Sequence, residues 1–284
     1  MTGYFAPSSM AVRALRQRAV GLTYGQRALV IGATHPELYV GTAQYTSHRE
    51  TPWTRLALTA RLFETVFLGD REEADKALQF TSRRHASVPG AAVPDLMWMT
   101  AAFTLDSVEV MHDLLVRRLT TGEREALLAD FVDWACLFGM PRAAAPTSYA
   151  AFRTRMDERL VNGEAFLTDE ARLTGSYIAG KDGYPLPGPA TLGSPALSTV
   201  IVGSLPGEVR GLYGLRWTAA DQAAYVAITT GSRVAHQRIP LLARTPLLRG
   251  ESRASYRSIA ATEHRQLRRG KVSMPGVSDV PSPY

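Results

Sequence analysis

A single cysteine, Cys136, stands among the 284 residues of the sequence. One cysteine excludes an internal disulfide, a CxxC redox pair, a structural zinc site built from thiolates and the CxxCH motif that attaches a c-type haem covalently. The scarcity of cysteine also favours a reducing, cytoplasmic location. Histidine is therefore the side chain best suited to ligate a metal in this protein.

Lysine is also scarce: only three of the 32 basic residues are lysine, and the other 29 are arginine. Such a skew is typical of a GC-rich coding sequence, so the number of arginines is weak evidence for a binding function. Five of the six net positive charges lie in residues 241–284. We therefore expect no nucleic-acid partner. The C-terminal basic residues indicate the solvated end of a helix, with an acidic partner or an anionic membrane as the alternative. These residues are Arg257, Arg265, Arg268, Arg269 and Lys271.

Long hydrophobic runs are missing. Arginines interrupt the first twenty residues, so we expect no signal peptide. Five prolines interrupt the longest uncharged stretch, residues 183–207, so we expect no transmembrane segment.

Several common catalytic motifs are missing as well. The sequence has no HExxH, no P-loop, no GxGxxG and no GxSxG. Only one ExxH occurs, from Glu109 to His112, whereas a di-iron carboxylate bundle needs this element on two facing helices. Zinc proteases, nucleotide-binding folds, α/β-hydrolases and di-iron bundles are therefore disfavoured.

Apolar residues recur every three to four positions through most of the chain, and no segment alternates for long, so the sequence predicts an all-α fold. With 45% hydrophobic residues the chain can bury a large core. We expect one helical domain over residues 1–270 and a disordered tail over residues 271–284. Helices are expected over residues 53–68, 70–85, 94–118, 120–138, 148–160, 168–178 and 218–238.

His85 has the strongest local case among the six histidines. It lies in helical register with Ala74, Leu78 and Thr81, which predicts that its imidazole faces inward. An inward imidazole can ligate haem iron, and Arg83 and Arg84 beside it could then pair with the haem propionates. The alternative is a core histidine bonded to a backbone carbonyl, with both arginines capping the end of the helix.

Arg55 and Thr59 are four residues apart and share one face of the helix predicted over 53–68, beside apolar positions such as Leu56. A guanidinium and a hydroxyl that face an apolar interior need partners. A bound anion, a haem propionate or dioxygen could supply them. An ion pair of Arg55 with Glu50 or Glu64 is the alternative.

The other histidines have weaker cases. His35 and His48 could hydrogen-bond to residues that themselves contact a ligand. Alternatively, they could be turn residues that bond to the backbone. His112, His236 and His264 have charged or polar neighbours, and we expect them at the surface.

Several short motifs, taken in order along the chain, resemble those of the oxygenase superfamily that includes latex-clearing protein and the B-type oxygenase of the mycophenolic-acid pathway (MpaB-like). Each motif is short, and their order and spacing carry the resemblance, which covers about residues 4–240. The motifs are YFAPSS at 4–9, RALV at 27–30, THP at 34–36, PWTRLALT at 52–59, HASVPG at 85–90, LDS at 105–107, LFGMP at 137–141, LPGEVR at 205–210 and YGL at 213–215.

The resemblance implies an all-α fold with a globin-like core, a non-covalent haem b, and His85 as the ligand of the haem iron. It implies that Arg55 and Thr59, which match an Arg-x-x-x-Thr element, lie beside the haem. Rubber-cleaving members carry a lysine directly before that threonine, whereas this sequence has Leu58, which disfavours rubber cleavage. The same members use a glutamate upstream of the arginine as a base.

Glu37 and Glu50 are the candidates for such a base.

The function implied is that of a haem b-dependent oxygenase acting with O2 on an apolar small molecule, such as an isoprenoid or another alkenyl compound. Two alternatives stay open: a haem-containing peroxidase or dehydrogenase on the same scaffold, and a haem-free helical protein that binds an apolar ligand.

Overall fold

The computed structural model describes residues 3–38, 50–161, 165–180, 194–239 and 248–270, and these residues form helices and turns without a strand. The predicted all-α fold is confirmed. No helix in the described ranges is both long enough and apolar enough to cross a membrane. His48, Lys271 and the predicted tail over 271–284 lie outside the described residues.

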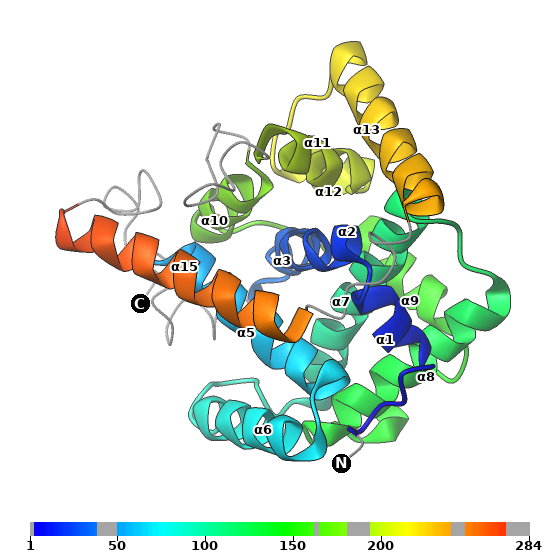
Figure 1. Cartoon of the computed structure of the whole chain (residues 1–284), viewed down its shortest axis with the longest axis vertical. Coiled ribbons are helices and arrows are strands. Elements are labelled where there is room, and N and C mark those ends of the chain that lie inside the picture. Colours follow the sequence, from blue (N-terminus) through cyan, green and yellow to red (C-terminus); the bar gives the residue numbers. More distant parts are fainter. Residues whose placement is uncertain (1–2, 39–49, 162–164, 181–193, 240–247, 271–284) are drawn as a thin grey trace.

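The chain forms short helices at its start, a long helical hairpin, and then a series of packed helices that ends in a long C-terminal helix (Figure 1). The first half contains α1 (Met10–Leu15), α2 (Arg18–Gly21), α3 (Tyr24–Gly32), α5 (Pro52–Leu68), α6 (Arg71–His85), α7 (Pro94–Leu115) and α8 (Thr121–Leu137). The second half contains the 3-10 helix η1 (Arg142–Ala144), α9 (Tyr149–Val161), α10 (Asp169–Ala179), α11 (Ser194–Ser204), α12 (Gly207–Leu212), α13 (Ala219–Arg238) and α15 (Leu248–Arg268).

Local capping sets several helix boundaries where the sequence predicts them. α6 begins with a capping box in which Asp70 accepts from the Glu73 N–H and Glu73 accepts from the Asp70 N–H. α8 and α13 begin with equivalent boxes. α7 ends at Leu115, three residues before the predicted boundary, because Asp113 accepts the N–H of Leu119 at 2.7 Å and so holds the chain in a turn.

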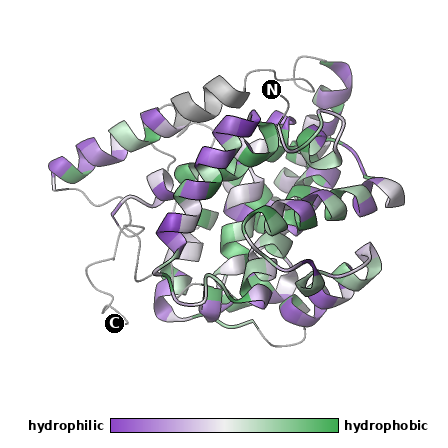
Figure 2. Ribbon diagram, turned by 90° about the horizontal axis from the view of Figure 1, so that it is seen from below, coloured by the Kyte–Doolittle hydropathy of each residue, from purple (hydrophilic) through white to green (hydrophobic). Residues whose placement is uncertain are grey.

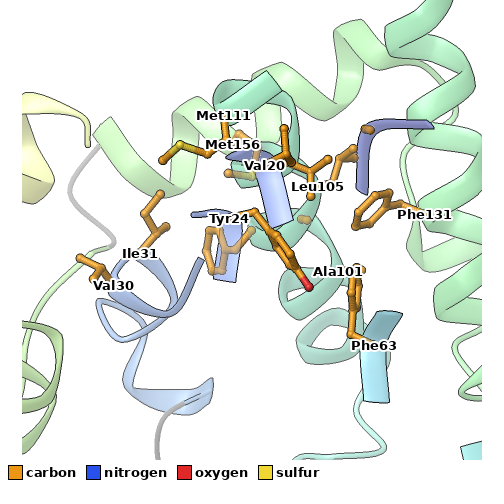
Figure 3. Packing of buried hydrophobic residues seen from close by; sticks show 14 of the residues in the cluster. Val20, Tyr24, Val30, Ile31, Phe63, Ala101, Leu105, Met111, Phe131 and Met156 are labelled. Atoms are coloured by element: carbon orange, nitrogen blue, oxygen red, sulfur yellow. The ribbon is translucent and has the colours of Figure 1, made fainter. Parts of the chain in front are cut away.

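Helix α7 lies at the centre of the molecule and packs against α1, α2, α3, α8 and α13. Hydrophobic residues concentrate in these interior helices, and hydrophilic ones on the outer surfaces (Figure 2). Figure 3 shows Tyr24 of α3, Phe63 of α5, Leu105 of α7 and Phe131 of α8 converging in the core. The rings of Phe63 and Phe131 are 5.8 Å apart, so α5 joins the core through its aromatic face.

A buried ion network ties the central helix to its neighbours. Arg27 of α3 donates to one oxygen of Asp106 at 2.5 Å, and Arg153 of α9 donates to the other at 2.5 Å. Burial disfavours the charged form of Asp106, but the two guanidinium charges outweigh it and lower the pKa of this carboxyl. Arg27 also donates to the Ser204 carbonyl of α11 at 3.3 Å. The network therefore fixes four helices relative to one another.

The C-terminal helix α15 packs lengthwise on α5, and Figure 1 shows it in front of that helix. Ile259 contacts the main core, and Glu263 is fully buried. The predicted exposure of the arginines in the segment is confirmed for the four that the structure describes. These are Arg257, Arg265, Arg268 and Arg269. The helix is nevertheless amphipathic, and its inner face is covered by α5.

Our expectation that His112 lies at the surface is wrong, because α7 is surrounded by other helices along most of its length. The His112 side chain is 3% exposed, and its Nδ1–H donates to the Arg117 carbonyl at 2.9 Å. Burial lowers the pKa of His112 to about 4. His236, also expected at the surface, is half-buried, whereas His264 is exposed as predicted.

The lowered pKa of His112 predicts a specific loss of stability at mildly acidic pH. Between pH 6.5 and 4 the unfolded chain binds a proton that the folded chain does not, so the free energy of unfolding falls by up to about 3 kcal/mol over this range. His112→Gln should remove this part of the pH dependence in urea unfolding measured at pH 7.5, 5.5 and 4.5. His264→Gln, at an exposed position, should keep the wild-type slope, and the prediction is wrong if His112→Gln keeps it too.

Candidate functional site

The hairpin of α5 and α6 brings the first turn of α5 beside the last turn of α6. The two helices pack against each other and are joined by a tight turn at Gly69 and Asp70. Gly69 is required there, because a Cβ at this position would collide with the Thr65 carbonyl oxygen. A short connection makes neighbouring helices antiparallel, so Arg55 returns to the neighbourhood of His85.

Arg55 and Thr59 lie on the same face of α5, as their spacing predicts, and they also contact each other, which we did not predict. The Arg55 guanidinium donates to the Thr59 hydroxyl, and this hydroxyl donates to the Arg55 carbonyl at 3.0 Å. The expected alternative, an ion pair with Glu50 or Glu64, is not formed: Glu50 is exposed, and Glu64 is buried with the Tyr24 hydroxyl 3.5 Å away. Thr59 thus holds the guanidinium against its own helix.

The prediction that His85 faces inward is wrong. Along the inner stripe of α6 the exposed fraction rises from 0% at Ala74 to 8% at Leu78; Thr81 is half-buried and His85 is exposed. The middle of α6 packs on Val66 of α5 and on α8, whereas its last turn extends beyond these partners. The imidazole therefore has an accessible edge.

Arg55, Arg84 and His85 form a cationic cluster at the open end of the hairpin. Partial desolvation first, and the Arg55 charge second, lower the pKa of His85. Desolvation and the Arg84 charge likewise lower the pKa of Arg55. Within the described ranges neither Arg55 nor Arg84 forms an ion pair; Arg84 lies over the Phe80 ring at 5.6 Å. The cluster is therefore suited to receive negative charge.

Arg83 is oriented differently from its neighbour Arg84. Its Nε donates to the Gln79 carbonyl of the same helix at 3.3 Å. The Gln79 carbonyl lies inside α6, so this contact is not the capping of the helix end that we gave as the alternative for both arginines.

Sequence reasoning overlooked Thr81 as a site residue. Its hydroxyl is buried and has no hydrogen-bond partner among the residues that the structure describes, although a helical threonine can donate to the carbonyl four residues earlier. Thr81 lies one helical turn before His85, and this spacing was the available signal. A buried hydroxyl without a partner next to the cationic cluster can bond to a bound ligand.

The comparison with protein families gives a match over residues 12–234 to the family described as ER-bound oxygenase mpaB/B'/Rubber oxygenase, catalytic domain. The chain belongs to this family. This confirms the resemblance drawn from the sequence motifs. The part that matches the mpaB/rubber oxygenase family includes the whole hairpin and ends before α15 begins. No curated protein and no solved structure matches the chain.

The other predicted site residues of this mpaB/rubber oxygenase domain lie apart from the cationic cluster or at its margin. His35 is 1% exposed, with Nδ1 3.1 Å from the Thr34 hydroxyl and its ring 4.9 Å from that of Phe103, so it belongs to the core. Glu37 is exposed. Leu58, where rubber-cleaving members carry lysine, is half-buried on α5.

A cavity of about 220 Å³ lies between α7 and α9. Its apolar lining comes from Trp98, Met99, Phe103, Phe152 and Met156. Polar residues also line it, among them Asp95 and Arg159, which form an ion pair at 2.8 Å. None of the residues of the cationic cluster lines this cavity.

The closeness of Arg55 to His85 can be measured without any ligand. Replacing Arg55 by Gln removes a positive charge that disfavours imidazolium, so the pKa of His85 should rise toward its ordinary value of 6.5. The pKa is read from the pH titration of the His85 ring resonances in NMR spectra. Arg83→Gln serves as the control, since the Arg83 guanidinium is directed to the Gln79 carbonyl of its own helix, and an equal rise in both variants would contradict the arrangement.

Proposed function

We propose that this protein is a haem b-dependent oxygenase that acts with O2 on an apolar small molecule, such as an isoprenoid or another alkenyl compound. The observation that carries the proposal is the cationic cluster of Arg55, Arg84 and His85 within a family of oxygenases. An accessible imidazole next to two arginines that have no carboxylate partner among the described residues suits a haem with two propionates.

The residues present fit a b-type haem in three respects. A lowered pKa keeps His85 neutral at pH 7, and neutral imidazole is the form that ligates iron. Arg55 and Arg84 supply two guanidinium groups for carboxylates, and each can bind a carboxylate through paired N–H donors. Cys136 is the single cysteine of the chain, so the haem would be held without thioether bonds.

When bound, the haem supplies the electron-transfer chemistry that activates dioxygen. The chain's own residues then have distinct roles. His85 would ligate the iron, Arg84 would hold a propionate, and Arg55 would hold a propionate or polarise oxygen. Thr59 orients the Arg55 guanidinium, because its hydroxyl proton is engaged by the Arg55 carbonyl. Thr81 offers its hydroxyl to the ligand.

The surroundings of the cluster favour an apolar substrate. Leu58 and Leu62 on α5 are half-buried, and Phe80 on α6 is 39% exposed. Leu58 in place of lysine leaves no amine at this position that could compete for the iron. We also propose that the core is globin-like, that residues 1–270 form one domain, and that the protein is cytoplasmic.

The haem-free alternative has an observation of its own. The cavity between α7 and α9 lies apart from the cationic cluster, and aromatic and methionine side chains line it together with charged residues. In that case the protein would fold fully without pigment and carry an apolar ligand.

Reconstitution with haem separates these possibilities. The purified wild-type protein supplied with haem should show a Soret band and b-type bands on reduction, and His85→Ala should abolish them or change the iron coordination. His264→Ala, at an exposed position of α15, should leave the spectrum unchanged. The assignment of His85 fails if its variant keeps the wild-type spectrum, and the haem proposal fails if the wild type binds no haem.

Isotopic oxygen distinguishes an oxygenase from a peroxidase or dehydrogenase on the same scaffold. With ¹⁸O2 and a panel of apolar alkenes that includes squalene, mass spectrometry should find ¹⁸O in the product. Arg55→Gln should reduce product formation about 100-fold if Arg55 stabilises charge that develops during the reaction. Products that form only with added peroxide and carry no label would instead assign the peroxidase function.

A further inference from the structure

The C-terminal helix places a buried carboxylate at the start of the helix that carries Arg55. Glu263 of α15 has 0% exposure and accepts the Thr54 N–H at 2.6 Å through one oxygen and the Trp53 N–H at 3.2 Å through the other. Its partners are thus the second and third residues of α5. In the described part of the chain Glu263 has no arginine or lysine partner, and these two N–H groups at the start of α5 are the donors that it accepts from.

A carboxylate satisfies two physical requirements at this place. The first N–H groups of a helix have no partner within it, and Pro52, the first residue of α5, has no N–H of its own. Trp53 is 4% exposed, so its N–H group has little access to water. An anion at a helix N-terminus also interacts favourably with the helix dipole. Glu263 therefore caps α5 from a segment more than 200 residues away in sequence.

A second contact fixes the register between the two helices. The Arg61 guanidinium of α5 lies over the Tyr256 ring of α15 at 5.6 Å. Tyr256 precedes Glu263 by two turns, while its partner Arg61 follows Thr54 by two turns, so the helices run antiparallel. α15 lies beyond residues 12–234, which match the oxygenase family.

The first turn of α5 determines where the Arg55 side chain lies. Arg55 directly follows Thr54, its N–H donates to the Thr51 carbonyl at 3.0 Å, and its guanidinium extends to Thr59 on the next turn. If this turn frays, the guanidinium leaves its place opposite His85. We propose that Glu263 is a positioning residue, and that α15 acts as a strap that holds Arg55 in the proposed haem site.

This inference rests on the proposed function for its effect on haem, and its effect on His85 can be measured without haem. Glu263→Gln keeps the size of the side chain but loses the charge and replaces one acceptor oxygen with a donor. Haem affinity, measured by titration of the Soret absorbance, should fall about tenfold, as expected for the loss of one charged hydrogen bond. In the haem-free protein the NMR titration of His85 should move in the same direction as in Arg55→Gln.

A double-mutant cycle separates positioning from a general loss of stability. In the Arg55→Gln background, Glu263→Gln should have little further effect on haem affinity, because the group that it positions is gone. Glu208→Gln is the matched control: it removes one negative charge from the exposed first turn of α12 and should leave the haem affinity and the His85 titration unchanged. Circular dichroism verifies that each variant is folded.

The proposal is overturned if Glu263→Gln keeps the wild-type haem affinity and His85 titration, or if its effect is equally large in the Arg55→Gln background. If Glu263→Gln does not fold, Glu263→Asp replaces it, because aspartate keeps the charge but is too short to reach both N–H groups. A wild-type protein that binds no haem contradicts the proposed function. The His85 titration then still decides whether Glu263 positions Arg55.

Discussion

The carboxylate of Asp106, buried between Arg27 and Arg153, is the interaction on which the arrangement of the helices depends. A buried charge is tolerated only when it is paired with good geometry, so each of the two arginines must stay in place. They come from α3 and α9, and Asp106 itself comes from the central helix α7. The position of the central helix is thereby fixed. Helix α8 packs against it, and the aromatic face of α5 packs against α8 through Phe63 and Phe131.

The α5–α6 hairpin is buried at one end and open at the other, and this difference produces the candidate site. Near the turn, Val66 and Leu78 pack against each other and against aromatic residues of α8. At the far end the supporting helices stop, and Arg55, Arg84 and His85 meet without a carboxylate among the described residues to neutralise them. Like charges at close range raise the free energy of the protein, and a bound anion lowers it again. The packed end of the hairpin, near the turn, therefore holds in place the open end, where the cationic cluster can bind a ligand.

Two parts of the chain contribute to this site: the residues that match the oxygenase family, and helix α15 beyond them. The matched part contains every side chain of the cationic cluster. α15 contributes the Glu263 carboxylate, which satisfies backbone donors that no residue of α5 itself can satisfy. Helix α15 therefore has two faces: its outer face carries exposed arginines, and its inner face caps the helix that carries Arg55.

The sequence by itself determined the features that depend on neighbouring residues: the helical segments, the shared helix face of Arg55 and Thr59, and the family motifs. These follow from hydrogen-bond geometry over three or four positions, which any helix imposes. Periodicity correctly placed Ala74 and Leu78 on the buried stripe of α6. It could not show that the packing partners end before His85, that α7 is covered on the side of His112, or that Glu263 caps α5. Burial and capping of this kind depend on segments that are distant along the chain, and only the tertiary structure brings those segments together.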